Sequence, residues 1–148
     1  MKGKLLHEES GQKTFAVVFD TGDEVATGLL AFAKEKGFAG SHFTAIGALS
    51  GVTFGFFDWD KKDYQKLQID EQVEVLSLIG DIAFDKGEPK IHAHIVVSKS
   101  DGTAYGGHLI EAHVRPTLEV ILVESPKHLV RKFNDETGLA LIDLAVNK

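Results

Sequence analysis

Residues 89–124 read PKIHAHIVVSKSDGTAYGGHLIEAHVRPTLEVILVE, and they decide the fold because two apolar runs flank a turn. Apolar residues alternate or run continuously from Ile91 to Val97, and a second run extends from Ala104 towards Val114. The tripeptide 100–102, Ser-Asp-Gly, has typical turn chemistry. This stretch therefore predicts a β-hairpin.

Three of the seven histidines, His92, His94 and His108, fall within this hairpin. Side chains two apart in a strand share a face, so His92 and His94 point the same way, with Cα atoms about 6.5 Å apart. Whether His108 joins them depends on the register of the two strands. A two-residue loop would place His94 opposite Leu109 and turn His108 to the other face.

A three-residue loop has the opposite consequence. With Gly102 in the left-handed conformation and a G1 bulge, Lys99 pairs with Thr103 and His94 lies directly opposite His108. All three imidazoles then converge on one point.

A bulge at Gly106 and Gly107 would restore this parity even with a two-residue loop, because one inserted residue flips every side chain beyond it. We expect one of these two arrangements. The two glycines directly before His108 also permit a backbone or a ligand to come close.

Three neutral imidazoles around one point offer ligands to a divalent metal ion, with Zn–N near 2.0–2.1 Å and a fourth position left for water or substrate. The alternative is structural: His92 and His94 are half-buried strand residues bonded to backbone, and His108 flanks a turn. The third histidine beside a glycine pair favours the metal. The chain has no cysteine, so the ligands would be nitrogen and oxygen, which suits Zn, Fe, Mn, Ni or Co. We expect zinc.

The composition is that of an ordinary soluble protein, and 148 residues are enough for one domain spanning 1–148. Sixteen basic and twenty-two acidic residues give a net charge of −6, which repels phosphate backbones and disfavours a general nucleic-acid binder. The small basic clusters, Lys61-Lys62 and Lys127-His128 with Arg131-Lys132, are interpreted as solvated faces.

The absence of cysteine excludes disulfides and thiol catalysis and is compatible with a reducing compartment. The first ten residues, MKGKLLHEES, lack the apolar core of a signal peptide. No run approaches the roughly 18 apolar residues that span a membrane. These features predict a cytoplasmic location and no membrane partner.

Periodicity predicts the remaining elements. Strands are expected over residues 4–9, 14–20, 64–69, 73–84, 118–123 and 139–146. A helix is expected from Asp23 or Glu24 to Lys36, with Gly37 just after it. A second, short helix is expected to start with Ser125 as N-cap and Pro126 at its first position, and to end near Thr137.

Residues 41–58 contain two apolar runs interrupted by Gly47, Ser50, Gly51 and Gly55, which predicts a bent hairpin at a sheet corner. The expected fold class is α+β: a largely antiparallel, curled sheet of about eight to ten strands, with one main helix and a second short helix packed on it. With few helices to cover it, one face of the sheet is expected to meet other subunits.

Three segments resemble the PPC ("plants and prokaryotes conserved") domain, a family of unknown function. They are AIGALSGVTFGFFD at 45–58, VEVLSLIGDIA at 73–83, and 89–120 of the hairpin. The most specific part is H-x-H followed by D-G-x-x-x-G-G-H-L and T-x-E-V. The resemblance runs from Thr14 to Val146.

This resemblance implies an α+β fold that assembles as a homotrimer with clefts at subunit boundaries. Plant members usually accompany an AT-hook, Arg-Gly-Arg-Pro, which this sequence lacks. The architecture is also similar to acetolactate decarboxylase, a metalloenzyme that holds zinc with three histidines partly arranged as H-x-H. Carried over residue by residue, that similarity gives His92, His94 and His108 as metal ligands.

Two functional hypotheses follow. The first is metal-assisted chemistry on a small oxygen-bearing molecule, with Glu119 as the first candidate for a proton shuttle. Glu111 and His113 have the wrong parity to face the metal. The second is a non-enzymatic binding or assembly module, which includes a regulatory or DNA-associated role despite the missing AT-hook.

Overall fold

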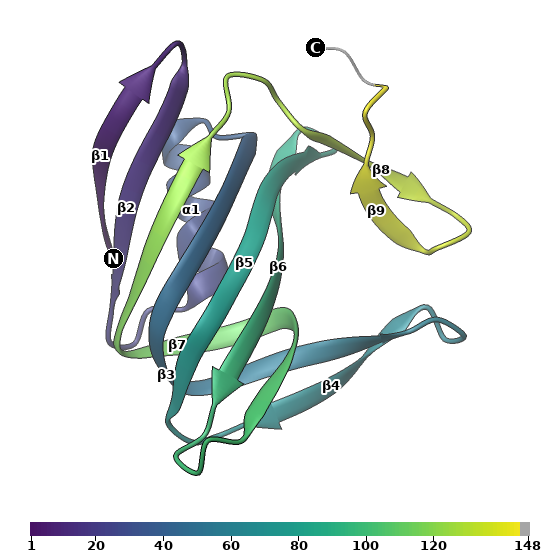
Figure 1. Cartoon of the computed structure of the whole chain (residues 1–148). Coiled ribbons are helices and arrows are strands. Elements are labelled where there is room, and N and C mark those ends of the chain that lie inside the picture. The colour runs from purple at the N-terminus through teal and green to yellow at the C-terminus, as the bar shows by residue number, and fades with distance from the viewer. Residues whose placement is uncertain (146–148) are drawn as a thin grey trace.

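The computed structural model describes residues 1–145, which form nine strands and one helix that lies against one side of the sheet (Figure 1). The helix α1 spans Val25–Lys36. The strands are β1 Lys2–Glu9, β2 Gln12–Asp20, β3 Gly40–Asp58, β4 Asp63–Ile69, β5 Val73–Asp85, β6 Glu88–Ser98, β7 Ala104–Glu124, β8 Val130–Asn134 and β9 Leu139–Ile142. Within the described residues no helix is long and apolar enough to cross a bilayer.

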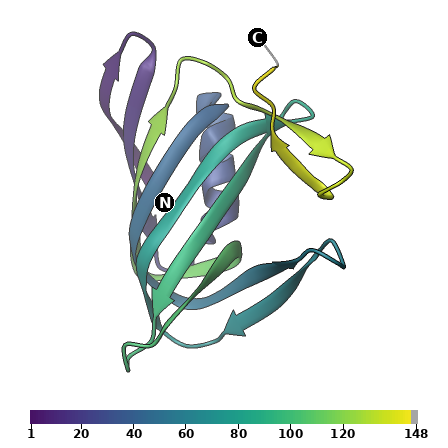
Figure 2. The same cartoon turned by 45° about the vertical axis from the view of Figure 1, so that its right-hand side comes forward.

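The strands form one mixed sheet in the order β1-β2-β7-β3-β5-β8-β9, with β4 paired to β3. All pairings are antiparallel except that between β5 and β8. Strand β6 pairs with both β5 and β7, so the sheet curls back on itself. Figure 2 shows this curl, with α1 on one side of the sheet. The predicted antiparallel, curled sheet is confirmed.

The core lies between α1 and one face of the sheet because apolar residues alternate along each strand. In β2, Phe15, Val17 and Phe19 are buried, and in α1 the stripe that includes Leu29 and Phe32 packs among them. The opposite side, called here the outer face, carries His42, Thr44, Ile46, Ile79, Asp81, His92, His94, Glu119 and Ile121. No helix of the described residues covers it.

Strand β3 corrects the expectation of a hairpin over residues 41–58. It is one continuous strand that pairs first with β5 and then with β4. Its register shifts between Ala45 and Gly47, and again between Leu49 and Gly51 where it pairs with β7. The glycines therefore bend the strand through bulges and do not reverse it.

The expected second helix is wrong: residues 130–142 form the β8–β9 hairpin. The Ser125 hydroxyl accepts a hydrogen bond from the Lys127 amide at 3.3 Å, as an N-cap would, but only a local turn forms and no helix follows before β8. The Leu129 amide then bonds the Ala39 carbonyl at 2.8 Å, and Val130 pairs with β5. Long-range backbone bonds thus override the local cap signal. A strand was expected over residues 139–146, and the structure has one over Leu139–Ile142. Val146, the last residue of the expected strand, lies outside the described residues.

Both ends of α1 agree with the prediction. Gly37 adopts φ 71°, the left-handed conformation that closes a helix. At the other end the Glu24 carboxylate accepts from the amides of Ala26 and Thr27 at 3.1 and 2.8 Å. It also accepts from the Ala112 amide of β7 at 3.2 Å, so one side chain both caps the helix and ties it to the sheet.

We expect Glu24→Ala to lower the free energy of unfolding by about 2 kcal/mol, because several donors lose a charged acceptor. Partial burial raises the pKa of Glu24, but the hydrogen bonds from Thr27, Ala26 and Ala112 outweigh it and leave the pKa lowered. The stabilisation is therefore present above the unfolded pKa and lost as pH falls through the folded one. Urea denaturation at pH 7 and pH 3 measures both effects, and Glu35→Ala on the exposed face of α1 is the control.

Candidate metal centre

The turn between β6 and β7 has the three-residue form. The Lys99 amide bonds the Thr103 carbonyl at 3.0 Å, and the Gly102 amide bonds the Lys99 carbonyl at 2.9 Å. Gly102 has φ 83°, a left-handed conformation that a glycine adopts without strain. His94 consequently pairs directly with His108, and no bulge interrupts the register between them and the turn. Of the two arrangements expected from the sequence, this one is confirmed.

The histidines lie on the outer face because Ala93, Ile95 and Val97 of the same strand are buried in the core. His92 and His94 therefore alternate to the exposed side of β6, and His108 is half-buried on β7. The packing of the core and the placement of the imidazoles select the same register.

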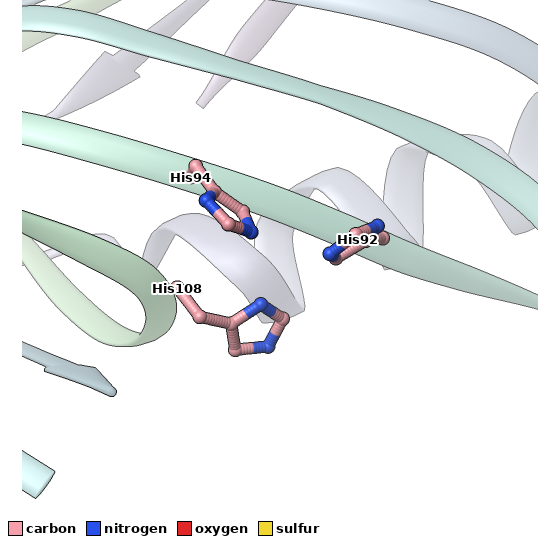
Figure 3. Close-up of side chains that lie close together, drawn as sticks. All are labelled: His92, His94 and His108. Atoms are coloured by element: carbon pink, nitrogen blue, oxygen red, sulfur yellow. The ribbon is translucent and has the colours of Figure 1, made fainter. Parts of the chain in front are cut away.

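The three rings converge (Figure 3). Their centroids are 5.2 Å apart for His92 and His94, 5.3 Å for His92 and His108, and 5.6 Å for His94 and His108. One ring nitrogen from each lies within 4.8 Å of the others. Ligand atoms in a tetrahedral zinc site are about 3.3 Å apart, so the three ring nitrogens would move closer together to hold an ion.

Close backbone approach holds His108 in place. A Cβ on Gly107 would lie 2.7 Å from the carbonyl oxygen of Gly55, so β7 can lie this near β3 only with glycine there. Gly55 likewise leaves room for Tyr64, whose ring stacks on His108 with centroids 4.5 Å apart and planes at 20°. The sequence did not identify Tyr64, because β4 is brought beside His108 only by the bend of β3.

Electrostatics keep two of the rings neutral. Burial, together with the neighbouring His92 and His94, lowers the pKa of His108 to about 4. Burial also lowers the pKa of His92, as does Arg131, while Asp81 opposes them. A neutral imidazole is the form that binds a metal. The buried Nδ1 of His108 has no hydrogen-bond partner within residues 1–145, which fits a ring nitrogen that can coordinate a metal.

An ion pair lies beside the histidines. Asp81 of β5 lies opposite His92 in the strand register. The guanidinium of Arg131, on β8, contacts the Asp81 carboxylate. Arg131 also donates to the Ala140 carbonyl of β9 at 3.1 Å, so it joins β5 to the C-terminal hairpin. Arg131 is buried, which corrects its interpretation as part of a solvated face, whereas Lys127, His128 and Lys132 are exposed as predicted.

Two hollows border the cluster. One of about 340 Å³ is lined by His92, His108 and Tyr64 together with β8 and β9. The other, of about 410 Å³, is lined by His92, His94 and Asp81 on the outer face. A metal at the cluster could therefore present a coordination position to a space of ligand size.

The carboxylates considered from the sequence lie elsewhere. Glu119 is exposed on the outer face, opposite Ile46, and lines a separate hollow with Glu74. Glu111 and His113 contact each other at 2.8 Å and line a third hollow. Within one chain, the structure does not bring Glu119 to the three imidazoles.

Comparison with known proteins finds a family model, a curated relative and solved structures that match most of this chain. The model of the Plants and Prokaryotes Conserved (PCC) domain, the family abbreviated PPC above, matches residues 6–126. A curated relative, the bifunctional protein GlmU of Synechococcus sp., is 30% identical over 106 residues, which cover 70% of this chain. The chain spans 16% of that relative's length.

Solved structures share the fold. A metal-containing protein from Archaeoglobus fulgidus is 35% identical, with a TM-score of 0.83 over 96% of this chain and 99% of that one. A candidate DNA-binding protein from Bacteroides thetaiotaomicron is 28% identical, with a TM-score of 0.85 over 95% and 96%. A Staphylococcus aureus protein similar to alpha-acetolactate decarboxylase is 13% identical, with a TM-score of 0.54 over 74% and 50%. This last similarity concerns the fold alone.

In metal-free protein we expect the His108 ring to titrate near pH 4, well below its ordinary 6.5. The unfolded chain then binds a proton that the folded chain rejects, so stability is full above about pH 6.5 and falls as pH drops towards 4. NMR of the ring protons, with unfolding measured in chelator at pH 7 and 5, checks this. His108→Gln should flatten the pH dependence and His7→Gln should not. A His108 titration near 6.5 would contradict the prediction.

Proposed function

This chain belongs to the Plants and Prokaryotes Conserved domain family, and we propose that it binds one divalent metal ion, zinc, through His92, His94 and His108. The observation that carries the proposal is the meeting of three ring nitrogens within 4.8 Å on adjoining strands. The low pKa of His108 and its unpartnered, buried Nδ1, judged within residues 1–145, support the same assignment. The metal-containing relative from A. fulgidus is consistent with it.

Three protein ligands leave zinc one position for water or a substrate. When bound, the ion would polarise an oxygen-bearing ligand or lower the pKa of a bound water. The chain's own residues would supply the surroundings: Tyr64 covers one side of His108, and Asp81 lies across from His92. A carboxylate in that place suits the outer shell that orients a metal-bound imidazole.

We favour metal-assisted chemistry on a small molecule over a purely structural ion. The reason is the hollow of about 340 Å³ that includes His92 and His108 in its lining, since a structural zinc is normally closed by a fourth protein ligand. Glu119 is not assigned to proton transfer within one chain, because it lines another hollow.

A DNA-associated module is the alternative. The candidate DNA-binding relative favours it, and the net charge of −6 opposes it.

We further propose that copies of the chain assemble through the outer face, as the homotrimer that the family resemblance implies. Ile46 and Ile79 are 62% and 54% exposed there, and Ile121 lies in the same band across β7. Ile79 pairs with His94, so this apolar band reaches the metal ligands. Exposed apolar surface of this kind is typical of a protein interface.

We expect protein purified without chelator or metal-affinity resin to carry about one zinc ion per chain, because three imidazoles meet at one point. Elemental analysis measures this. His92→Ala and His108→Ala should each weaken zinc affinity by at least roughly 100-fold, since each removes a direct ligand.

His113→Ala is the matched control, because His113 lies on β7 outside the cluster and should leave the zinc content unchanged. Wild-type protein that takes up no stoichiometric metal after incubation with zinc, nickel or cobalt would refute the site.

We expect wild-type protein to sediment with about three times the 16.1 kDa mass of one chain. Ile46→Asp combined with Ile121→Asp should shift it to monomer, because two buried carboxylates would disrupt an apolar interface. Leu144→Asp is the control, since Leu144 is exposed and follows the end of β9, outside the strands that form that face. A wild-type monomer at micromolar concentration in analytical ultracentrifugation would overturn the assembly.

A further inference from the structure

The hollow beside His92 and His108 is built by segments far apart in the sequence. Tyr64 comes from β4, the two histidines come from β6 and β7, and residues 139–142 come from β9. Figure 2 shows the β8–β9 hairpin standing opposite the β3–β4 arm, and Lys62 joins their tips by donating to the Asp135 carbonyl at 2.9 Å. The hollow has a volume of about 340 Å³, which is the size of a small-molecule site.

The charged residues that line this hollow are cationic. Lys90 and Arg131 belong to its lining, whereas no aspartate or glutamate among residues 1–145 does. The partner carboxylates lie outside the lining: Asp85 contacts Lys90 at 3.3 Å, and Asp81 contacts Arg131. The lining thus holds the cation of each ion pair, and the carboxylate of each pair lies outside it. A bound divalent ion would strengthen this positive potential.

The remaining wall is apolar. Leu139, Leu141 and Ile142 of β9 line it together with Ile91, and the Tyr64 ring closes the side next to His108. Arg131 holds this wall in place through its bond to the Ala140 carbonyl. A ligand would thus have a charged end near the metal and an uncharged, carbon-rich end against β9.

We infer that this hollow binds a small organic carboxylate, with its carboxylate towards His92, His108 and Lys90, where a metal held by the histidines would attract it, and its carbon skeleton against β9. The inference rests on the proposed metal site and names the class of molecule that the site would take. An amine would be repelled by Lys90 and the metal. Inorganic phosphate would leave the apolar wall without a partner, and a nucleic-acid duplex is too large for the space.

Benzoate, benzamide and benzylamine test the inference, because they share one ring and differ in charge. In isothermal titration of the zinc-loaded full chain, dialysed against zinc-free buffer, we expect benzoate to bind at least about tenfold more tightly than the other two and than inorganic phosphate. Lys90→Met should weaken benzoate binding by roughly threefold to tenfold, and Lys13→Met, far away on β2, should not change it.

Leu141→Asp places a carboxylate on the apolar wall and should abolish benzoate binding, whereas Leu144→Asp should retain it. Zinc content is measured for every variant. Wild-type protein that holds zinc but binds benzamide or phosphate as tightly as benzoate would overturn this inference and leave the metal site standing. Wild-type protein that holds no zinc would refute the proposed function, and with it the inference.

Discussion

The register of the β6–β7 hairpin is the constraint on which the rest depends. Because side chains alternate with a period of two, one residue fewer in the turn would carry His108 away from His94. The left-handed Gly102 and the amide of Lys99 hold the three-residue form. The same register keeps the apolar side chains of β6 in the core, so hydrophobic burial and imidazole convergence support each other.

Curling of the sheet gives this hairpin its surroundings. Since β6 pairs with both β5 and β7, Asp81 lies across from His92 on one side, and the bent β3 brings β4 and Tyr64 to the other. The outer face then combines polar ligands with exposed isoleucines. An assembly through this face would place a partner beside the metal ligands, so chemistry and association would share one surface.

The C-terminal hairpin, β8–β9, forms in a segment whose local sequence also suits a helix. Ser125 and Pro126 form a good helix start, and Gly138 with φ 73° would suit a helix end. The same glycine instead closes a turn by bonding the Asn134 carbonyl at 2.8 Å. Pairing with β5 and the buried contact of Arg131 with Asp81 select the hairpin. This hairpin becomes the apolar wall of the hollow beside the histidines.

By itself the sequence determined the family, the antiparallel character of the sheet, the main helix with the glycine that ends it, and a hairpin in which three histidines could share a face. Local patterns carry these features, because alternation, turn residues and caps act over a few positions. Only the tertiary structure decided between the two turn registers, made β3 one bent strand, and replaced the second helix by β8 and β9. It alone placed Tyr64, Asp81 and Arg131 around the histidines, and Glu119 away from them. These outcomes depend on pairing between segments distant in the chain, where backbone hydrogen bonds and core packing outweigh local preference.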